Sequence, residues 1–109
     1  MQITDVPFGV TDWSNVERVE HPGAQGTSYW QTQQCGSIRV RIVEYTVGYR
    51  ADHWCSKGHI VFCIEGRLHT ELSDGRRFTL GPGMSYQVAD GAEPHLSHTE
   101  GGAKLFIVD

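Results

Sequence analysis

Residues 48–66 read GYRADHWCSKGHIVFCIEG, a polar loop that runs into a dense apolar stretch. The part from His59 to Glu65 is rich in β-branched and aromatic side chains, which strands favour. Gly66 ends this stretch, and glycine is common where a chain turns. The segment therefore predicts a loop that leads into a strand over residues 59–66.

Alternating patterns continue on both sides of this segment. Ile38, Val40 and Ile42 alternate with arginines, and a period of two marks a half-buried strand. Further strands are expected over residues 27–34, 38–47, 68–73, 76–80, 86–88, 95–99 and 103–108. Short strands joined by glycine-rich turns, such as Asp74-Gly75, predict an all-β sandwich or barrel.

The N-terminal residues carry a mixed pattern. Residues 6–10 fit a short edge strand, where Pro7 is tolerated. Residues 11–17 fit a helical turn that Thr11 or Asp12 could cap. We therefore expect a single domain over residues 1–109, with an N-terminal arm over residues 1–25 and the barrel over residues 26–109.

Charge and cysteine content narrow the class of protein. The chain has 109 residues and a net charge of −4 at pH 7, and its nine lysines and arginines are scattered. We expect Arg39, Arg41, Arg76 and Arg77 on solvated faces, so no basic face for nucleic acid is predicted. No apolar run approaches the roughly 20 residues that span a bilayer. Three cysteines without a secretory leader predict a reducing cytoplasm.

The densest group of metal-binding residue types lies in the quoted segment. His53, Cys55 and His59 are two and four residues apart, so an extended strand would present all three on one face. Imidazole and thiolate ligands suit zinc, and also iron, nickel or copper. His95 lies on another expected strand and could complete a tetrahedron.

The other histidines and cysteines are expected in structural roles. His21 and His69 have no ligand neighbour in sequence and are expected on the surface. His98 is three residues after His95, so only one of the two can point inward, and we favour His95. Cys35 and Cys63 are expected to be buried as small apolar side chains.

The quoted segment also resembles the first motif of the cupin superfamily, in which a glycine precedes His-x-His, a glutamate and a second glycine. His53 stands at the first histidine position between Gly48 and Gly66. Cys55 stands at the second histidine position, and His59 stands at the glutamate position.

A second cupin motif, Pro-Gly followed by Pro-x-Gly and a histidine, is similar to the segment before His95. Pro82-Gly83 and Gly91 match this motif. Ala89 replaces its second proline, and one extra residue precedes His95.

The chain resembles a small bacterial group, the DHCW-motif cupin-fold proteins, more closely than it resembles the general cupin motifs. Residues 52–59, 86–90 and 105–109 carry this likeness, which extends over nearly the whole chain. The resemblance implies a single small antiparallel jelly-roll β-barrel of about eight to ten strands. It also implies a metal site, with His53, Cys55, His59 and His95 as the ligands.

Departures from the usual three-histidine, one-glutamate cupin site bear on the metal. A thiolate in place of a histidine and a histidine in place of the glutamate favour zinc first and iron second. Glu44, Asp52 or Glu65 could still supply a carboxylate, and Tyr86 could line the pocket.

Three functions are compatible with these residues. The first is a metal-dependent enzyme that acts on a small molecule in the barrel pocket. The second is a small-molecule binding or sensing module, and the third is a barrel whose metal is purely structural. Phe8 and Trp13 in the arm offer apolar contacts, so we also expect a homodimer, in which Trp54 packs between sheets or between subunits.

Overall fold

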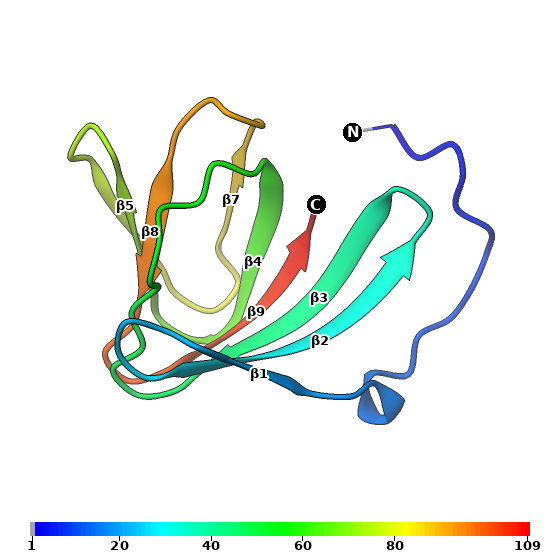
Figure 1. Cartoon of the computed structure of the whole chain (residues 1–109), viewed down its shortest axis with the longest axis horizontal. Coiled ribbons are helices and arrows are strands. Elements are labelled where there is room, and N and C mark those ends of the chain that lie inside the picture. Colours follow the sequence, from blue (N-terminus) through cyan, green and yellow to red (C-terminus); the bar gives the residue numbers. More distant parts are fainter. Residues whose placement is uncertain (1) are drawn as a thin grey trace.

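The computed structural model describes residues 2–109, which contain nine strands and one short 3-10 helix (Figure 1). The elements are η1 Trp13–Asn15, β1 Val19–Pro22, β2 Thr27–Cys35, β3 Ile38–Tyr45, β4 His59–Gly66, β5 Leu68–Leu72, β6 Arg77–Leu80, β7 Ser85–Val88, β8 His95–His98 and β9 Ala103–Val108. The strands expected from the alternating pattern are all present, within two residues at each end.

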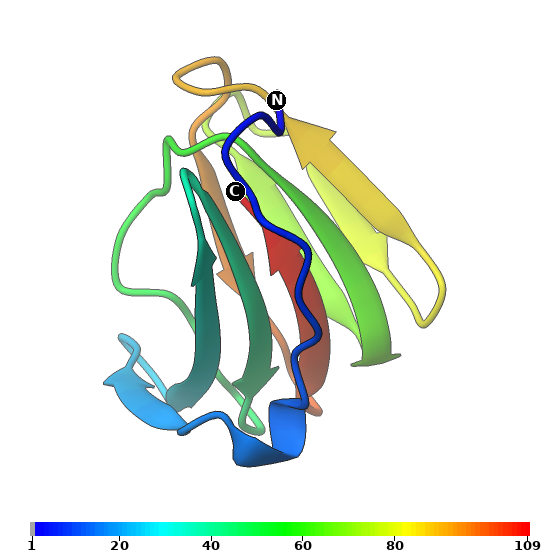
Figure 2. The same cartoon turned by 90° about the vertical axis from the view of Figure 1, so that its right-hand side faces the viewer.

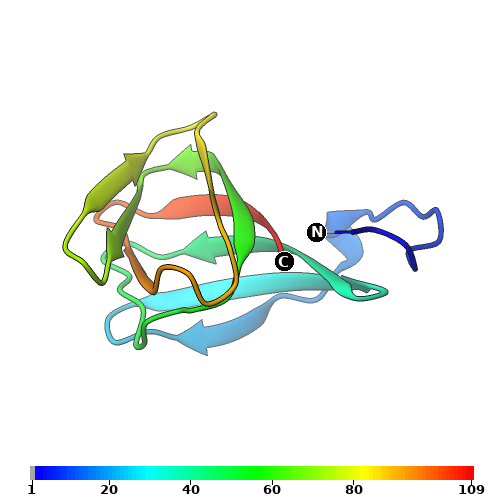
Figure 3. The same ribbon diagram turned by 90° about the horizontal axis from the view of Figure 1, so that it is seen from above.

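Two antiparallel sheets face each other and enclose the interior (Figure 3). The larger sheet has the strand order β1-β2-β3-β9-β4-β7, and the smaller has the order β6-β5-β8. The predicted jelly-roll fold is confirmed, although hydrogen bonding does not close the two sheets into one continuous barrel. Each sheet therefore contributes one wall, and residues from both walls can meet in the space between them.

The inner faces of the two sheets share a small apolar core. Its buried members are Val43, Val61, Cys63, Leu68, Leu80, Ala103, Leu105 and Ile107. Cys63 is completely buried, as predicted, and behaves as a small apolar side chain. Five of these residues also line the pocket described below: Val43, Val61, Leu68, Leu105 and Ile107.

The N-terminal arm differs in part from the prediction. Residues 6–10 form no strand, and the side chains of Phe8 and Val10 are almost fully exposed. The predicted helical turn is present, and the Asp12 carboxylate accepts a hydrogen bond from the Ser14 amide at 3.0 Å. Figure 2 shows the arm as a strand-free segment that runs along the larger sheet before β1, and Asp5 accepts a hydrogen bond from the Ser37 amide. β1 itself pairs with β2.

Within residues 2–109, no helix is long and apolar enough to cross a bilayer.

Candidate metal centre

Three of the four predicted ligands come together where the two sheets meet. His59 begins β4 of the larger sheet, and His95 begins β8 of the smaller sheet. Cys55 lies in the loop before β4 and forms a two-way backbone bridge with His95, with N–O distances of 2.8 and 2.9 Å. The loop is thereby fixed against β8, and the thiol is carried to the two imidazoles.

The ligand atoms of these residues are close enough to share one ion. One ligand atom each from Cys55, His59 and His95 lies within 4.8 Å of the other two. The Nε2 atoms of His59 and His95 are 2.9 Å apart. In the part of the chain that the structure describes, this is the one group of three or more such residues.

Polar neighbours on the Nδ1 side favour one tautomer of each ring. The Glu93 carbonyl lies 2.9 Å from Nδ1 of His95, and a carbonyl can only accept, so we assign the ring proton to Nδ1. On His59, Nδ1 faces the Asp109 carboxylate at 3.7 Å, and that atom is buried with no hydrogen bond to any residue from 2 to 109. A proton on Nδ1 is again the favourable choice, since the other tautomer would turn a lone pair toward the carboxylate.

This arrangement fits a cation. With both protons on Nδ1, the two Nε2 atoms lie 2.9 Å apart with lone pairs that one positive ion could accept. The Glu93 carbonyl and the Asp109 carboxylate lie behind the two rings, where ligating histidines usually have such supports. Cys55 adds a third donor, and thiolate with imidazole is a donor set that zinc and iron accept.

Cys55 and His59 have protonation states that favour metal binding, whereas His95 tends to keep a proton that a metal must displace. A hydrogen bond with His95 lowers the pKa of the Cys55 thiol and raises that of His95. Burial, reinforced by the neighbouring His95, lowers the pKa of His59 to about 4. At neutral pH His59 is therefore uncharged, and the thiol is more readily ionised than an ordinary cysteine.

His53 is not part of this group. Its side chain is 76% exposed, and its Nδ1 lies 2.6 Å from the Asp52 carboxylate. The even-spacing argument requires an extended strand, but residues 46–58 form no strand between β3 and β4. His53 instead lines the pocket next to the group.

The carboxylates suggested from sequence lie elsewhere, and a different one is present. Glu44 pairs with Arg18 and Lys104, and neither Asp52 nor Glu65 joins the ligand group. Asp109, which sequence analysis did not select, has a completely buried side chain beside His59. Its charge partners, Arg39 and Arg41, lie about 70 residues earlier on β3, so no local sequence pattern links them to Asp109.

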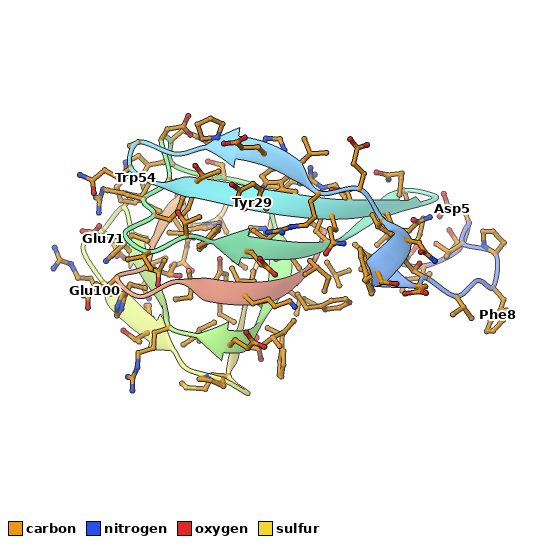
Figure 4. The ribbon with its side chains drawn as sticks, turned by 90° about the horizontal axis from the view of Figure 1, so that it is seen from below. Asp5, Phe8, Tyr29, Trp54, Glu71 and Glu100 are labelled. Atoms are coloured by element: carbon orange, nitrogen blue, oxygen red, sulfur yellow. The ribbon has the colours of Figure 1, made fainter. Side chains whose placement is uncertain are left out.

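A pocket of about 340 Å³ opens onto the three ligands. Its walls include Trp30, Tyr45, Tyr49, Trp54 and Tyr86, together with Arg39, Arg41 and Lys57. The Tyr86 hydroxyl lies 3.3 Å from Nε2 of His59, so this residue lines the pocket as expected. Trp54 is about half exposed and lies at the end of the molecule opposite Phe8 (Figure 4).

The arginines of β3 were predicted on a solvated face, and that prediction is wrong. Arg41 is only 5% exposed, and Arg39 also points into the pocket. Both pair with Asp109, whose burial they make possible. A buried charge requires such a partner, and the alternating pattern alone did not identify one.

Comparison with known proteins supports the fold. No protein-family model matches the chain, and no curated protein matches it in sequence. Among solved structures, ectoine synthase from P. lautus is 17% identical with a TM-score of 0.75, covering 93% of this chain and 76% of that one. An RmlC-like cupin from Shewanella frigidimarina NCIMB 400 is 16% identical with a TM-score of 0.71, covering 96% and 92%.

A third similar structure is Fe(II)-HppE with an alternative substrate, (S)-1-HPP. It is 15% identical with a TM-score of 0.75, and the match covers 94% of this chain and 60% of that one. At these identities the likeness concerns the fold. The chain has the cupin fold, with a Cys-His-His group that can bind a metal ion between its two sheets.

Proposed function

We propose that this protein is a metal-dependent enzyme that binds a divalent ion through Cys55, His59 and His95 and acts on a small molecule in the adjacent pocket. The observation that carries the proposal is that three donors within 4.8 Å of one another lie at the wall of a 340 Å³ pocket. Three protein ligands leave an open position for water or substrate, which distinguishes catalytic from structural zinc sites.

Zinc is the first choice of metal and iron the second. The donor set is one sulfur and two nitrogens without a carboxylate, which fits zinc better than the two-histidine, one-carboxylate iron site. Iron stays the second choice because HppE, which has a similar fold, holds Fe(II).

The bound ion would act as a Lewis acid on an oxygen of the substrate. The residues of the chain would hold the substrate in place. Burial raises the pKa of the Tyr86 phenol, so its hydroxyl stays protonated and can donate a hydrogen bond beside His59. Trp30, Tyr45 and Tyr49 would exclude water from the substrate, since aromatic walls are typical of small-molecule pockets.

Two alternatives lead to different experiments. In a sensing module the pocket binds a small molecule without turnover. In a structurally metallated barrel, the ion stabilises the fold and has no open position. The exposure of His53, which leaves three rather than four grouped donors, favours the catalytic alternative over the structural one.

Metal analysis of protein purified without chelators tests the proposal. We expect about one ion per chain, and a marked loss of metal in Cys55→Ser with the fold retained by circular dichroism. Cys35→Ser is the matched control, because Cys35 is also a free, half-buried thiol but lies outside the group. A drop of many degrees in the melting temperature of Cys55→Ser would indicate a structural ion.

The proposal fails if the wild-type protein carries no metal and binds neither Zn²⁺ nor Fe²⁺ on titration. The three residues would then be polar pocket lining, and the sensing module would become the leading function.

Two further proposals concern the setting of the protein. We propose that the protein is a homodimer. The 97% exposure of Phe8 and the exposed Ile60 and Phe62 on β4 support this proposal. A monomeric mass in solution at micromolar concentration would contradict it. We also propose a reducing cytoplasm, supported by the three free cysteines.

A further inference from the structure

Two arginines in the pocket share one carboxylate. Arg39 holds Asp109 through both carboxylate oxygens, at 2.9 and 3.0 Å. Arg41 donates to the same carboxylate at 3.0 Å. Each guanidinium has five N–H donors, and these contacts use two of them on Arg39 and one on Arg41. Most of the donor capacity of this pair is therefore not used by Asp109.

Arg41 is the more unusual of the two. Its side chain is 6% exposed, and its Nε is buried with no hydrogen bond to any residue between 2 and 109. The guanidinium carbon lies 4.4 Å from the ring centre of Trp30, and the His21 ring stacks on Trp30 at 4.0 Å. Trp30 thus holds a nearly buried cation in one position at the pocket wall.

The pocket has an excess of positive charge. Arg39, Arg41 and Lys57 all line it, and Asp109 is the one acidic residue in the lining that the structure describes. A buried charge that lacks a full complement of partners is costly. A ligand that brings a second carboxylate would supply the missing charge and accept from the unused donors.

We propose that the pocket binds a small organic carboxylate on Arg41, with the rest of the ligand between the aromatic walls and the Cys-His-His group. The proposal rests on the proposed function, since it assigns the substrate class of that site. The arginine contact itself does not require the metal, so the two can be tested separately.

A carboxylate on an apolar body fits this pocket better than inorganic phosphate does. The guanidinium fork binds either group through two parallel hydrogen bonds, so the pocket wall makes the difference. Its five aromatic side chains favour a ligand with an apolar body over a small, strongly hydrated inorganic ion.

The test compares benzoate with benzamide, which have the same shape but differ in charge. Each is titrated into metal-free, chelator-treated protein by calorimetry, and inorganic phosphate is titrated in parallel. We expect benzoate to bind at least about tenfold more tightly than benzamide, because hydrogen bonds to charged groups are the stronger ones. We also expect the affinity for benzoate to fall as salt is added.

Variants locate the contact. Arg41→Gln should weaken benzoate binding about tenfold or more. Arg77→Gln is the matched control, since Arg77 is 78% exposed and lies outside this pocket, and it should leave binding unchanged. If Arg41→Gln fails to fold, Lys57→Met serves instead, because Lys57 is exposed and its loss should weaken benzoate binding by about twofold to threefold.

Equal affinity for benzoate and benzamide, or full benzoate affinity in a folded Arg41→Gln protein, would overturn the proposal. Phosphate binding tenfold tighter than benzoate would also overturn it, in favour of a phosphorylated ligand. Benzoate binding by a protein that takes up no metal would support the carboxylate site and defeat the metal-dependent function. Metal uptake without benzoate binding would support the metal-dependent function and defeat the carboxylate site.

Discussion

Two histidine pairs in this protein have almost the same spacing but very different surroundings. The His59 and His95 rings are 4.8 Å apart between centres, and the His69 and His98 rings are 5.0 Å apart. β8 supplies one member of each pair. His95 is opposite Leu72 of β5, and its side chain is buried between the sheets, whereas His98 is opposite His69.

The neighbours of each pair account for the difference. His59 faces the completely buried carboxylate of Asp109 at 3.7 Å, and Cys55 adds a third donor. His69 faces the Glu100 carboxylate at a similar 3.8 Å, but that carboxylate is 89% exposed. Figure 4 shows Glu100 at the periphery of the molecule. The comparison teaches that two close imidazoles do not define a site. The third donor and the buried carboxylate do.

The largest expected effect is on metal affinity. His95→Ala should weaken Zn²⁺ binding by about 100-fold or more, since loss of a supporting residue alone costs about 10- to 100-fold. His98→Ala, on the same strand, should change it less than about threefold. Competition with a chromogenic zinc chelator measures both constants. Equal losses in the two variants would mean that β8 acts on the ion through its fold rather than through His95.

The sequence was sufficient for most of the fold, because alternation and glycine-rich turns are local signals. It missed β1, where the residues Val19–Pro22 include a charged residue, a histidine and a proline but no apolar alternation. It also expected His21 and His69 on the surface, whereas each is half buried against a second ring.

The candidate site was predicted in part, again because local motifs carry most of its ligands. Cys55, His59 and His95 lie in recognisable motifs, and the structure groups them. His53 shares the motif but lies in a loop, where strand parity does not hold. Asp109 was not selected, and Arg41 was wrongly expected on a solvated face. Their pairing joins residues 68 positions apart, and no local pattern records a contact between β3 and the residue after β9.

The next effect in size concerns pH, and it sharpens the comparison by probing the shared proton of the site. The hydrogen bond between Cys55 and His95 lowers the pKa of the thiol and raises that of the imidazole. A metal must displace the proton that the two share, so the affinity for Zn²⁺ should fall as pH falls. We expect roughly a tenfold loss per pH unit below neutrality for one displaced proton.

Chelator competition at pH 7.5, 6.5 and 5.5 measures this slope. Cys55→Ser is the control, because serine carries no proton that zinc displaces in this range, and its shallower slope would assign the proton. A wild-type affinity that is flat across these pH values would contradict the thiolate ligand.

The smallest expected effect on metal affinity comes from the carboxylate next to the His59 and His95 pair, which is Asp109. Burial alone would raise the pKa of Asp109, but hydrogen bonds from Arg39 and the charge of Arg41 outweigh it and lower the pKa below its ordinary value. A carboxyl group with a depressed pKa in the folded state stabilises the protein above about pH 4, and this stability is lost as pH falls through the folded pKa.

At neutral pH Asp109 is therefore charged and orients His59, so Asp109→Asn should weaken Zn²⁺ binding about tenfold. It should also lower the free energy of unfolding by about 3 kcal/mol, because it leaves two arginines without their counter-charge. Glu100→Gln removes the equivalent carboxylate behind His69, yet its exposure limits the expected change to within about 0.5 kcal/mol. Urea denaturation of the metal-free proteins and zinc titration of the folded ones separate the two readouts. If Asp109→Asn loses stability but keeps full zinc affinity, Asp109 serves the arginines alone, and the difference between the two histidine pairs depends on Cys55.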